Sequence, residues 1–165
     1  MDLKVKNNPQ FRQGYLYAIR LLAASKKSES ELSSRLRKKG YPLDIIGQVI
    51  GELKAQGILS DQKLVRETVQ LAMQAGRYGH RRISFELKKR GVDSREIEKA
   101  LEAYPKAQEH EIAVALAQER WGKLQKVEPK KRTKRLFDFL VNRGFNFELA
   151  REVVNQMRFK VNENF

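Results

Sequence analysis

The centre of the chain reads Ile83-Ser84-Phe85-Glu86-Leu87-Lys88-Lys89-Arg90-Gly91-Val92, and the same pattern occurs in altered form on both sides of it. In each copy a glycine follows a basic residue, has apolar residues four and eight positions before it, and precedes an apolar or aromatic residue. The three glycines are Gly40, Gly91 and Gly144, which stand 51 and 53 residues apart. Self-similarity at a fixed period is the signature of a tandem repeat. The sequence therefore predicts three copies of one unit slightly longer than fifty residues.

The repeated pattern predicts the end of a helix. Apolar residues four positions apart lie on one stripe of a helix, and a glycine just past the last turn readily takes the left-handed conformation found at helix ends. We therefore expect Gly40, Gly91 and Gly144 to be structural helix C-caps of the Schellman type. Basic residues in the last turn complement the negative end of the helix dipole, so part of the positive charge needs no ligand to explain it.

Each copy also carries a helical pattern before and after this central helix. The residue two positions after each glycine can begin a helix; these residues are Pro42, Asp93 and Asn146. No segment has the pattern of a strand. We predict an all-α protein of nine helices in three tandem three-helix repeats, forming an elongated, curved array. The expected divisions are a flexible leader at 1–12, repeats at 13–57, 58–105 and 106–159, and a C-terminal tail at 160–165.

The chain is strongly basic and contains no cysteine. Its 165 residues include 34 Lys and Arg against 20 Asp and Glu, which gives a net charge of +14. Such a surface attracts polyanions or acidic protein surfaces, and the charge alone does not say which. The absence of cysteine is typical of a reducing compartment and excludes thiolate metal sites. No apolar run is long enough to span a membrane, and the first residues lack a signal peptide's apolar region. We expect a monomeric cytoplasmic protein without a membrane partner.

The sequence offers no catalytic or metal-binding pattern. Its two histidines, His80 and His110, stand thirty residues apart without the spacing of a zinc site. No glycine-rich phosphate loop is present. We therefore expect neither an enzyme nor a cofactor or metal, and we expect His80 to pack or to be solvated at a helix start.

Two basic clusters are candidates for contact with phosphates or acidic side chains. The first cluster consists of Arg77, Tyr78, Arg81, Arg82, Lys88, Lys89 and Arg90, and the second consists of Lys130, Lys131, Arg132, Lys134 and Arg135. Arg77, Arg81 and Arg82 stand at a helix start, where positive charge opposes the helix dipole and lowers stability, which favours a binding role. The alternative is a solvated helix face. A third cluster, Arg35 to Lys39, is explained by its helix end.

Four stretches, in this order, resemble the RecX family of RecA regulators. They are Ser30-Glu31-Leu32 through Gly40-Tyr41, Gly57-Ile58-Leu59-Ser60-Asp61, Arg77-Tyr78-Gly79 through Gly91-Val92, and Phe139-Leu140-Val141-Asn142-Arg143-Gly144-Phe145. The resemblance covers about residues 15–158. Ser60 and His80 depart from the family pattern, where an acid and a proline are frequent, and these changes affect a cap and a turn.

The resemblance implies a negative regulator that lies in the groove of the RecA–single-stranded DNA filament. It would limit extension of the filament, its ATPase and strand exchange activities, and its stimulation of SOS repressor cleavage, and so act in DNA repair and recombination. Single-stranded DNA would be contacted directly or through the filament. From the residues alone, two other functions stay open: a non-sequence-specific DNA-binding helical repeat protein, and a helical scaffold without nucleic acid.

Overall fold

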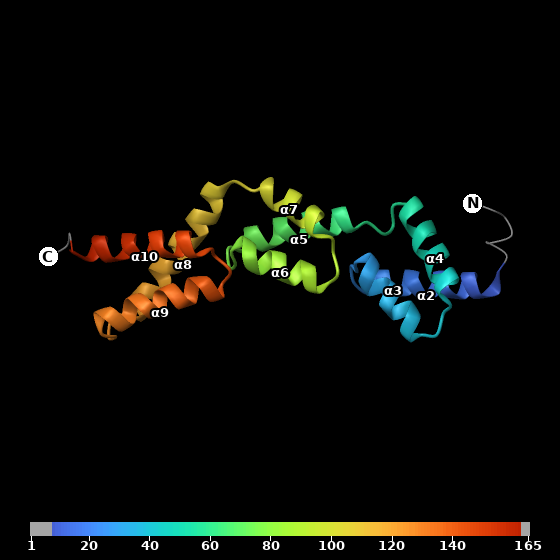
Figure 1. Ribbon diagram of the computed structural model, residues 1–165, viewed down its shortest axis with the longest axis horizontal. Helices are drawn as coiled ribbons and strands as arrows, with labels where there is room; N and C mark the ends of the chain where they lie inside the picture. The colour runs from blue at the N-terminus through green and yellow to red at the C-terminus, as the bar shows by residue number, and fades with distance from the viewer. Residues whose placement is uncertain (1–7, 163–165) are drawn as a thin grey trace. The chain divides into compact units, whose positions relative to one another are not determined.

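The computed structural model describes residues 8–162, with side chains up to Phe159, and shows nine helices and no strand in that range (Figure 1). In chain order the helices are α2 (Pro9–Ala24), α3 (Glu29–Lys38), α4 (Leu43–Ala55), α5 (Asp61–Ala75), α6 (His80–Lys89), α7 (Ser94–Glu102), α8 (Lys106–Lys123), α9 (Pro129–Asn142) and α10 (Phe147–Asn162). The predicted all-α fold with nine helices is thus confirmed for the described part of the chain.

The first helix begins earlier than the sequence predicts. The Oδ1 atom of Asn8 accepts a hydrogen bond from the N–H group of Gln10 at 2.9 Å, and Pro9 occupies the first turn, where its missing N–H group is no loss. Phe11 is buried. The prediction of a flexible leader is therefore wrong for residues 9–12, because one phenylalanine among polar residues gives no visible periodicity. Residues 1–7 lie outside the described part.

The C-terminal helix also runs past its predicted end. α10 reaches Asn162, so the backbone of the first residues of the expected 160–165 tail is helical. Residues 163–165 lie outside the described part.

The three repeat glycines end their helices with one geometry. Their φ angles are 94° for Gly40, 75° for Gly91 and 89° for Gly144. In each case the N–H group of the next residue donates to the carbonyl of the leucine four positions before the glycine, at 3.2 Å for Tyr41 to Leu36, 3.3 Å for Val92 to Leu87 and 3.2 Å for Phe145 to Leu140. This bond is the mark of the Schellman motif.

The described chain divides into two compact units. The first contains the chain up to Glu67 together with Leu87–Ile97, and the second contains Thr68–Glu86 and the chain from Glu98 onward. Each unit is built around one complete helix triplet, α2–α4 in the first and α8–α10 in the second. The helices α5, α6 and α7 are each shared between the two units.

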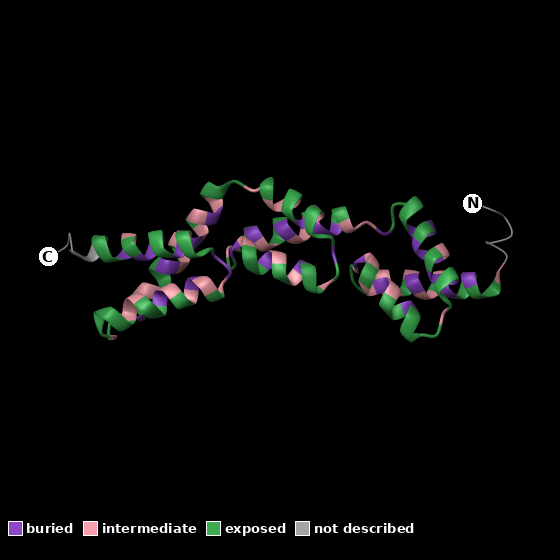
Figure 2. Cartoon of the chain, viewed as in Figure 1, coloured by how far each residue is buried: buried purple, intermediate pink, exposed green. Residues whose placement is uncertain are grey.

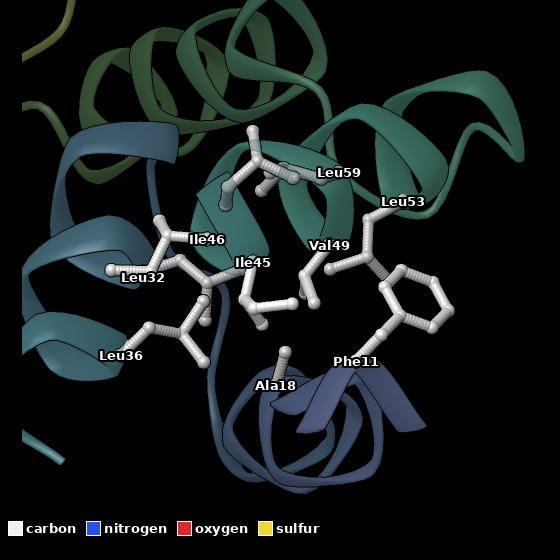
Figure 3. Packing of buried hydrophobic residues seen from close by; sticks show 10 residues of the cluster. Phe11, Ala18, Leu32, Leu36, Ile45, Ile46, Val49, Leu53 and Leu59 are labelled. Carbon is white, nitrogen blue, oxygen red and sulfur yellow. The ribbon is translucent and has the colours of Figure 1, made fainter. Parts of the chain in front are cut away.

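The core of the first unit lies between α2, α3 and α4. Figure 3 shows Leu32 and Leu36 of α3 directed toward Ile45 and Val49 of α4, with Ala18 of α2 closing the cluster from below. The buried residues of α4 include Ile45, Ile46, Val49, Ile50 and Leu53, which follow the apolar stripe of the helix. Removing this apolar surface from water is the main stabilising contribution.

The core of the second unit lies between α8, α9 and α10. Its buried positions recur along all three helices (Figure 2), and they include Leu136 and Leu140 of α9 and Val153 of α10. α8 contributes the small residues Ala113 and Ala117, which allow the larger side chains of α9 and α10 to fill the space beside it. The end of α9 is thereby fixed, and the candidate site is built on it.

Candidate functional site

The start of α6 lies against the glycine turn that ends α9. The N–H group of Gly79 donates to the carbonyl of Arg143 at 2.9 Å, and that of Arg81 donates to the carbonyl of Gly144 at 3.0 Å. A Cβ atom on Gly79 would lie only 2.6 Å from the Gly144 oxygen, so this approach requires glycine. The otherwise unpaired N–H groups of one helix start therefore bond to the carbonyls of another helix end.

A buried glutamate from α8 holds the same helix start. Glu109 is 7% exposed, and its Oε1 atom accepts a hydrogen bond from the N–H group of His80 at 2.8 Å. Its Oε2 atom lies 3.3 Å from Nδ1 of the His80 ring, which packs edge-on against Tyr104. His80 thus packs at a helix start, as the sequence predicted. Glu109 does not stand out in the sequence because it is one of several acids at helical spacing.

These contacts revise the dipole argument for Arg77, Arg81 and Arg82. The carbonyls that end α9 and the carboxylate of Glu109 supply negative charge at the start of α6, which the sequence analysis did not count. Arg82 also pairs with Glu86 at 2.8 Å. The three arginines are therefore accommodated at smaller loss of stability than their sequence positions indicate, and they are all exposed.

Aromatic rings lie beside the arginines of the second unit. The guanidinium carbon of Arg81 lies 5.4 Å from the centre of the Phe147 ring, which in turn stacks on Phe137 at 6.1 Å. Phe147 is exposed, whereas Phe137 is only partly so. Cations held over ring faces in this way are attracted by the ring quadrupole. Arg81 at the start of α6 is therefore oriented by the exposed ring of Phe147, which is backed by Phe137.

A second set of rings and guanidinium groups forms a continuous stack. Arg143 lies 5.5 Å from the ring of Tyr78 and 5.1 Å from the ring of Phe139, and Arg120 lies 5.3 Å from Phe139. We call Tyr78, Arg143, Phe139 and Arg120 the arginine–aromatic stack. Tyr78 is 39% exposed, so one end of the stack is open to solvent.

Arg143 also ties the turn before α6 to the end of α9. Its Nη1 atom donates to the main-chain carbonyl of Arg77 at 3.3 Å. The first unit contains the same contact, in which Nη2 of Arg90 donates to the carbonyl of Lys26 at 2.9 Å. Arg90 stands 53 residues before Arg143, and Lys26 stands 51 residues before Arg77. We call this repeated contact the arginine clasp.

The clasp of the first unit includes a capping box. The Ser28 hydroxyl donates to the carbonyl of Arg90 at 2.5 Å, and it accepts from the N–H group of Glu31 at 3.0 Å. Glu31 in turn accepts from the N–H group of Ser28 at 2.8 Å and pairs with Arg90 at 2.9 Å. Ser28 and Glu31 thus form a reciprocal capping box at the start of α3. The Arg90 side chain is engaged inside the first unit, whereas Lys88 and Lys89 are exposed.

The Glu31 carboxyl has a shifted pKa. Burial by itself raises this pKa, but the hydrogen bonds from Arg90 and from the Ser28 N–H group outweigh burial and lower it below the ordinary value of 4.5. The carboxylate is therefore the form that holds the clasp together.

The second basic cluster lies at the start of α9. Lys130 to Arg135 occupy the first turns of α9. Arg132 turns back toward the preceding segment, donating to the carbonyls of Gln125 at 2.6 Å and Val127 at 3.2 Å, and it lies 5.1 Å from the Trp121 ring. Lys131 pairs with Glu128 at 3.1 Å. The members of this cluster that are exposed and form no ion pair with the described residues are Lys130, Lys134 and Arg135.

A hollow lined by residues of α8 and α9 lies at the arginine–aromatic stack. Its lining residues are Arg120, Arg135, Asp138, Phe139, Asn142 and Arg143. Only Arg135 was a candidate in the sequence analysis. The signal that could have revealed the others is their spacing, because positions 135, 138, 139, 142 and 143 follow one stripe of a helix.

No metal site or membrane span emerges from this part of the molecule. Residues 8–162 contain no group of three or more His, Asp or Glu side chains placed to hold a metal ion. None of the nine described helices combines the length and apolar character that crossing a bilayer requires.

Three family models match the chain in sequence order. They describe the first, second and third three-helix domains of RecX, and they match residues 15–53, 60–101 and 107–154. These matches coincide with the three helix triplets of the structure.

Curated relatives and solved structures agree with these matches. A regulatory protein RecX from Mycolicibacterium smegmatis is 31% identical over 83% of this chain and 75% of its own length, and one from Clostridium botulinum is 29% identical over 84% and 66%. The chain thus spans slightly less than two thirds of the Clostridium relative. A crystal structure of RecX from Lactobacillus salivarius has the same fold, with a TM-score of 0.83 at 21% identity over 91% of this chain and 97% of that one. Taken with the three consecutive domain matches, these likenesses establish that the chain belongs to the RecX family of regulatory proteins.

Proposed function

We propose that this protein is a negative regulator of the RecA recombinase. It binds in the groove of the RecA–single-stranded DNA filament and limits filament extension, ATP hydrolysis, strand exchange and the stimulation of SOS repressor cleavage. Membership in the RecX family supports the proposal. The observation that carries it is the start of α6, where hydrogen bonds fix the backbone that bears the exposed side chains of Arg77, Arg81 and Arg82.

The rigidity of this helix start matters for binding. A surface fixed by its own fold loses little conformational entropy when it binds a partner. Gly79, Arg81 and His80 are each held by a main-chain hydrogen bond to α9 or α8, so the arginine side chains leave a fixed backbone. Such an arrangement suits acidic groups that a filament repeats at regular positions.

Each of the two units offers further exposed cations. Lys130, Lys134 and Arg135 lie on α9, and Lys88 and Lys89 lie at the end of α6. Contacts that are weak singly become strong together when they are linked on one chain. Binding spread over several RecA protomers would then compete with the DNA or repressor that enters the same groove.

The decisive experiment measures the single-stranded-DNA-dependent ATPase of RecA as this protein is added below stoichiometry. The measurement is repeated with excess single-stranded DNA. Inhibition that survives excess DNA supports action on the filament. Inhibition that excess DNA removes would instead favour the alternative, a non-sequence-specific DNA-binding helical protein.

A matched pair of triple variants assigns the surface. Arg77→Ala, Arg81→Ala and Arg82→Ala together should abolish most of the inhibition while leaving the helical circular dichroism unchanged. The control replaces Arg37, Arg66 and Arg95 by Ala. These arginines are also exposed, so their replacement removes the same charge from other helices. Equal loss in both triple variants would show that net charge, and not the start of α6, is responsible.

A further inference from the structure

The hollow between α8 and α9 contains more positive charge than the fold uses. It presents the guanidinium groups of Arg120, Arg135 and Arg143 and one carboxylate, that of Asp138, which leaves a local charge of +2. None of the three arginines forms an ion pair within residues 8–162. The nearby Glu119 is paired with Lys123 at 2.5 Å. Like charges that lie close together with fewer counterions than cations lower the stability of a fold, so their arrangement calls for an explanation.

Two of the guanidinium groups are held in position by aromatic rings. Phe139 lies 5.3 Å from Arg120 and 5.1 Å from Arg143, and Tyr78 lies 5.5 Å from Arg143 on the way to solvent. Arg143 gives one N–H group to the carbonyl of Arg77. Arg120 is only partly exposed, and its buried Nε atom has no hydrogen-bond partner among the described residues. Leaving a buried donor unpaired costs free energy, so packing alone does not account for Arg120.

The donors of the hollow suit a ligand with several acceptor oxygens. Three guanidinium groups and the amide of Asn142 line it, and they come from α8, from α9 and from the residue that caps α9. A carboxylate offers two oxygens in one plane, whereas a phosphate group offers oxygens around a tetrahedron. Stacked arginines favour bidentate contact with such groups because their planar forks are already oriented.

We propose that the hollow lined by Arg120, Arg135, Asn142 and Arg143 is a phosphate-binding site. The phosphate belongs either to a nucleic-acid strand or to a free phosphate compound, and both sources present the same tetrahedral oxyanion. The exposed ring of Tyr78 at the end of the arginine–aromatic stack can in addition take a base when the source is a strand. The proposed ligand is a phosphate group and not RecA, so the site goes beyond the proposed function, with Arg135 common to both.

The test uses the full chain without RecA. Binding of a short fluorescein-labelled oligothymidylate is followed by fluorescence anisotropy at low salt, and three competitors are compared at equal charge: pyrophosphate, an abasic phosphodiester chain and polyglutamate. Displacement by pyrophosphate supports a site open to free phosphate compounds, and displacement by the abasic chain alone supports a site for a strand. Equal displacement by polyglutamate, or no binding of oligothymidylate, would overturn the proposal.

Three variants separate the hollow from general positive charge. Arg120→Gln should weaken oligothymidylate binding about tenfold, because a charge-assisted hydrogen bond is lost. Arg120→Lys keeps the charge without the planar fork and should recover only part of the affinity. The control is Arg151→Gln, an exposed arginine on α10 of the same unit, which should change affinity less than about twofold. Equal effects of Arg120→Gln and Arg151→Gln would refute the site.

The outcome is distinguishable from failure of the proposed function. The Arg120 variants are also assayed for inhibition of the RecA ATPase. If the wild-type protein inhibits RecA but does not bind the phosphate probes, only the phosphate site is refuted. If it binds the probes without inhibiting RecA, only the proposed function is refuted.

Discussion

A Cβ atom on Gly144 would lie 2.4 Å from the backbone nitrogen of Arg82, so the turn that ends α9 and the start of α6 touch through main-chain atoms. The corresponding position at Gly40 has no atom within 4 Å. Both glycines have positive φ angles. Gly40→Ala should therefore lower the free energy of unfolding only by what a non-glycine residue loses in the left-handed conformation, about 1–2 kcal/mol. Gly144→Ala should cost clearly more, since a backbone atom must move, and urea denaturation of both variants measures the difference. Equal losses would mean that the contact at Gly144 is easily relaxed.

Glu109 should be needed for the stability of the second unit. Glu109→Ala leaves the N–H group of His80 without its acceptor and should lower the free energy of unfolding by roughly 1–3 kcal/mol. Glu109→Gln keeps an acceptor oxygen and should lose less. The matched control is Glu111→Ala, an exposed position on the same helix, which should change stability little. A similar loss at both positions would contradict the assigned role.

The clasp of the first unit should weaken in acid. The pKa of Glu31 is lowered in the folded protein, so its carboxylate stabilises the fold above the ordinary value of 4.5, and this contribution disappears as pH falls through the lower folded value. The difference in unfolding free energy between the wild type and Glu31→Gln should stay constant near neutral pH and shrink below about pH 4.5. Because the Glu31 side chain is 36% exposed, the difference should be modest. A difference that grows in acid would show the opposite sign of shift.

Arg132 should hold the connection between α8 and α9, and Trp121 reports on it. Trp121 is the one tryptophan of the chain and lies 5.1 Å from the Arg132 guanidinium carbon. Arg132→Gln removes that cation and the hydrogen bonds to two main-chain carbonyls, so the emission of Trp121 should change and stability should fall by about 1 kcal/mol. Lys131→Gln breaks a surface ion pair and should leave the Trp121 emission and the stability nearly unchanged. Identical spectra for wild type and Arg132→Gln would contradict this arrangement.

Much of the fold could be predicted because its signals are local. The Leu-to-Gly spacing at Leu36, Leu87 and Leu140 fixes where each central helix ends, since the left-handed glycine and the apolar pair are properties of consecutive residues. The start of α2 at Pro9 escaped the same reasoning. Its single buried residue before Gly14, Phe11, is anchored by the core of the first unit, which periodicity does not reveal.

The candidate site was less predictable because its chemistry depends on contacts between distant residues. Arg90 and Arg132 are basic residues beside other basic residues, and nothing local shows that their side chains bond to the carbonyls of Lys26 and Gln125. Arg120 and Phe139 were missed for the converse reason, since their pairing needs two helices to meet. The loss of stability expected for Arg81 at a helix start was too high. The carbonyls of another helix end lie beside this helix start, and the local sequence does not show them.

The arginine clasp makes the contact between the helix end and the preceding segment independent of most surface side chains. The segments that accept it read Lys26-Lys27-Ser28 in the first unit and Arg77-Tyr78-Gly79 in the second, and they share little chemistry. Each nevertheless accepts the arginine through a main-chain carbonyl. The residue before the glycine is held by the Ser28 hydroxyl in the first unit and by the N–H group of Gly79 in the second. Triplets from different RecX proteins should therefore be exchangeable as modules wherever the arginine–glycine pair is kept, and such chimaeras would carry a new contact surface on an unchanged joint.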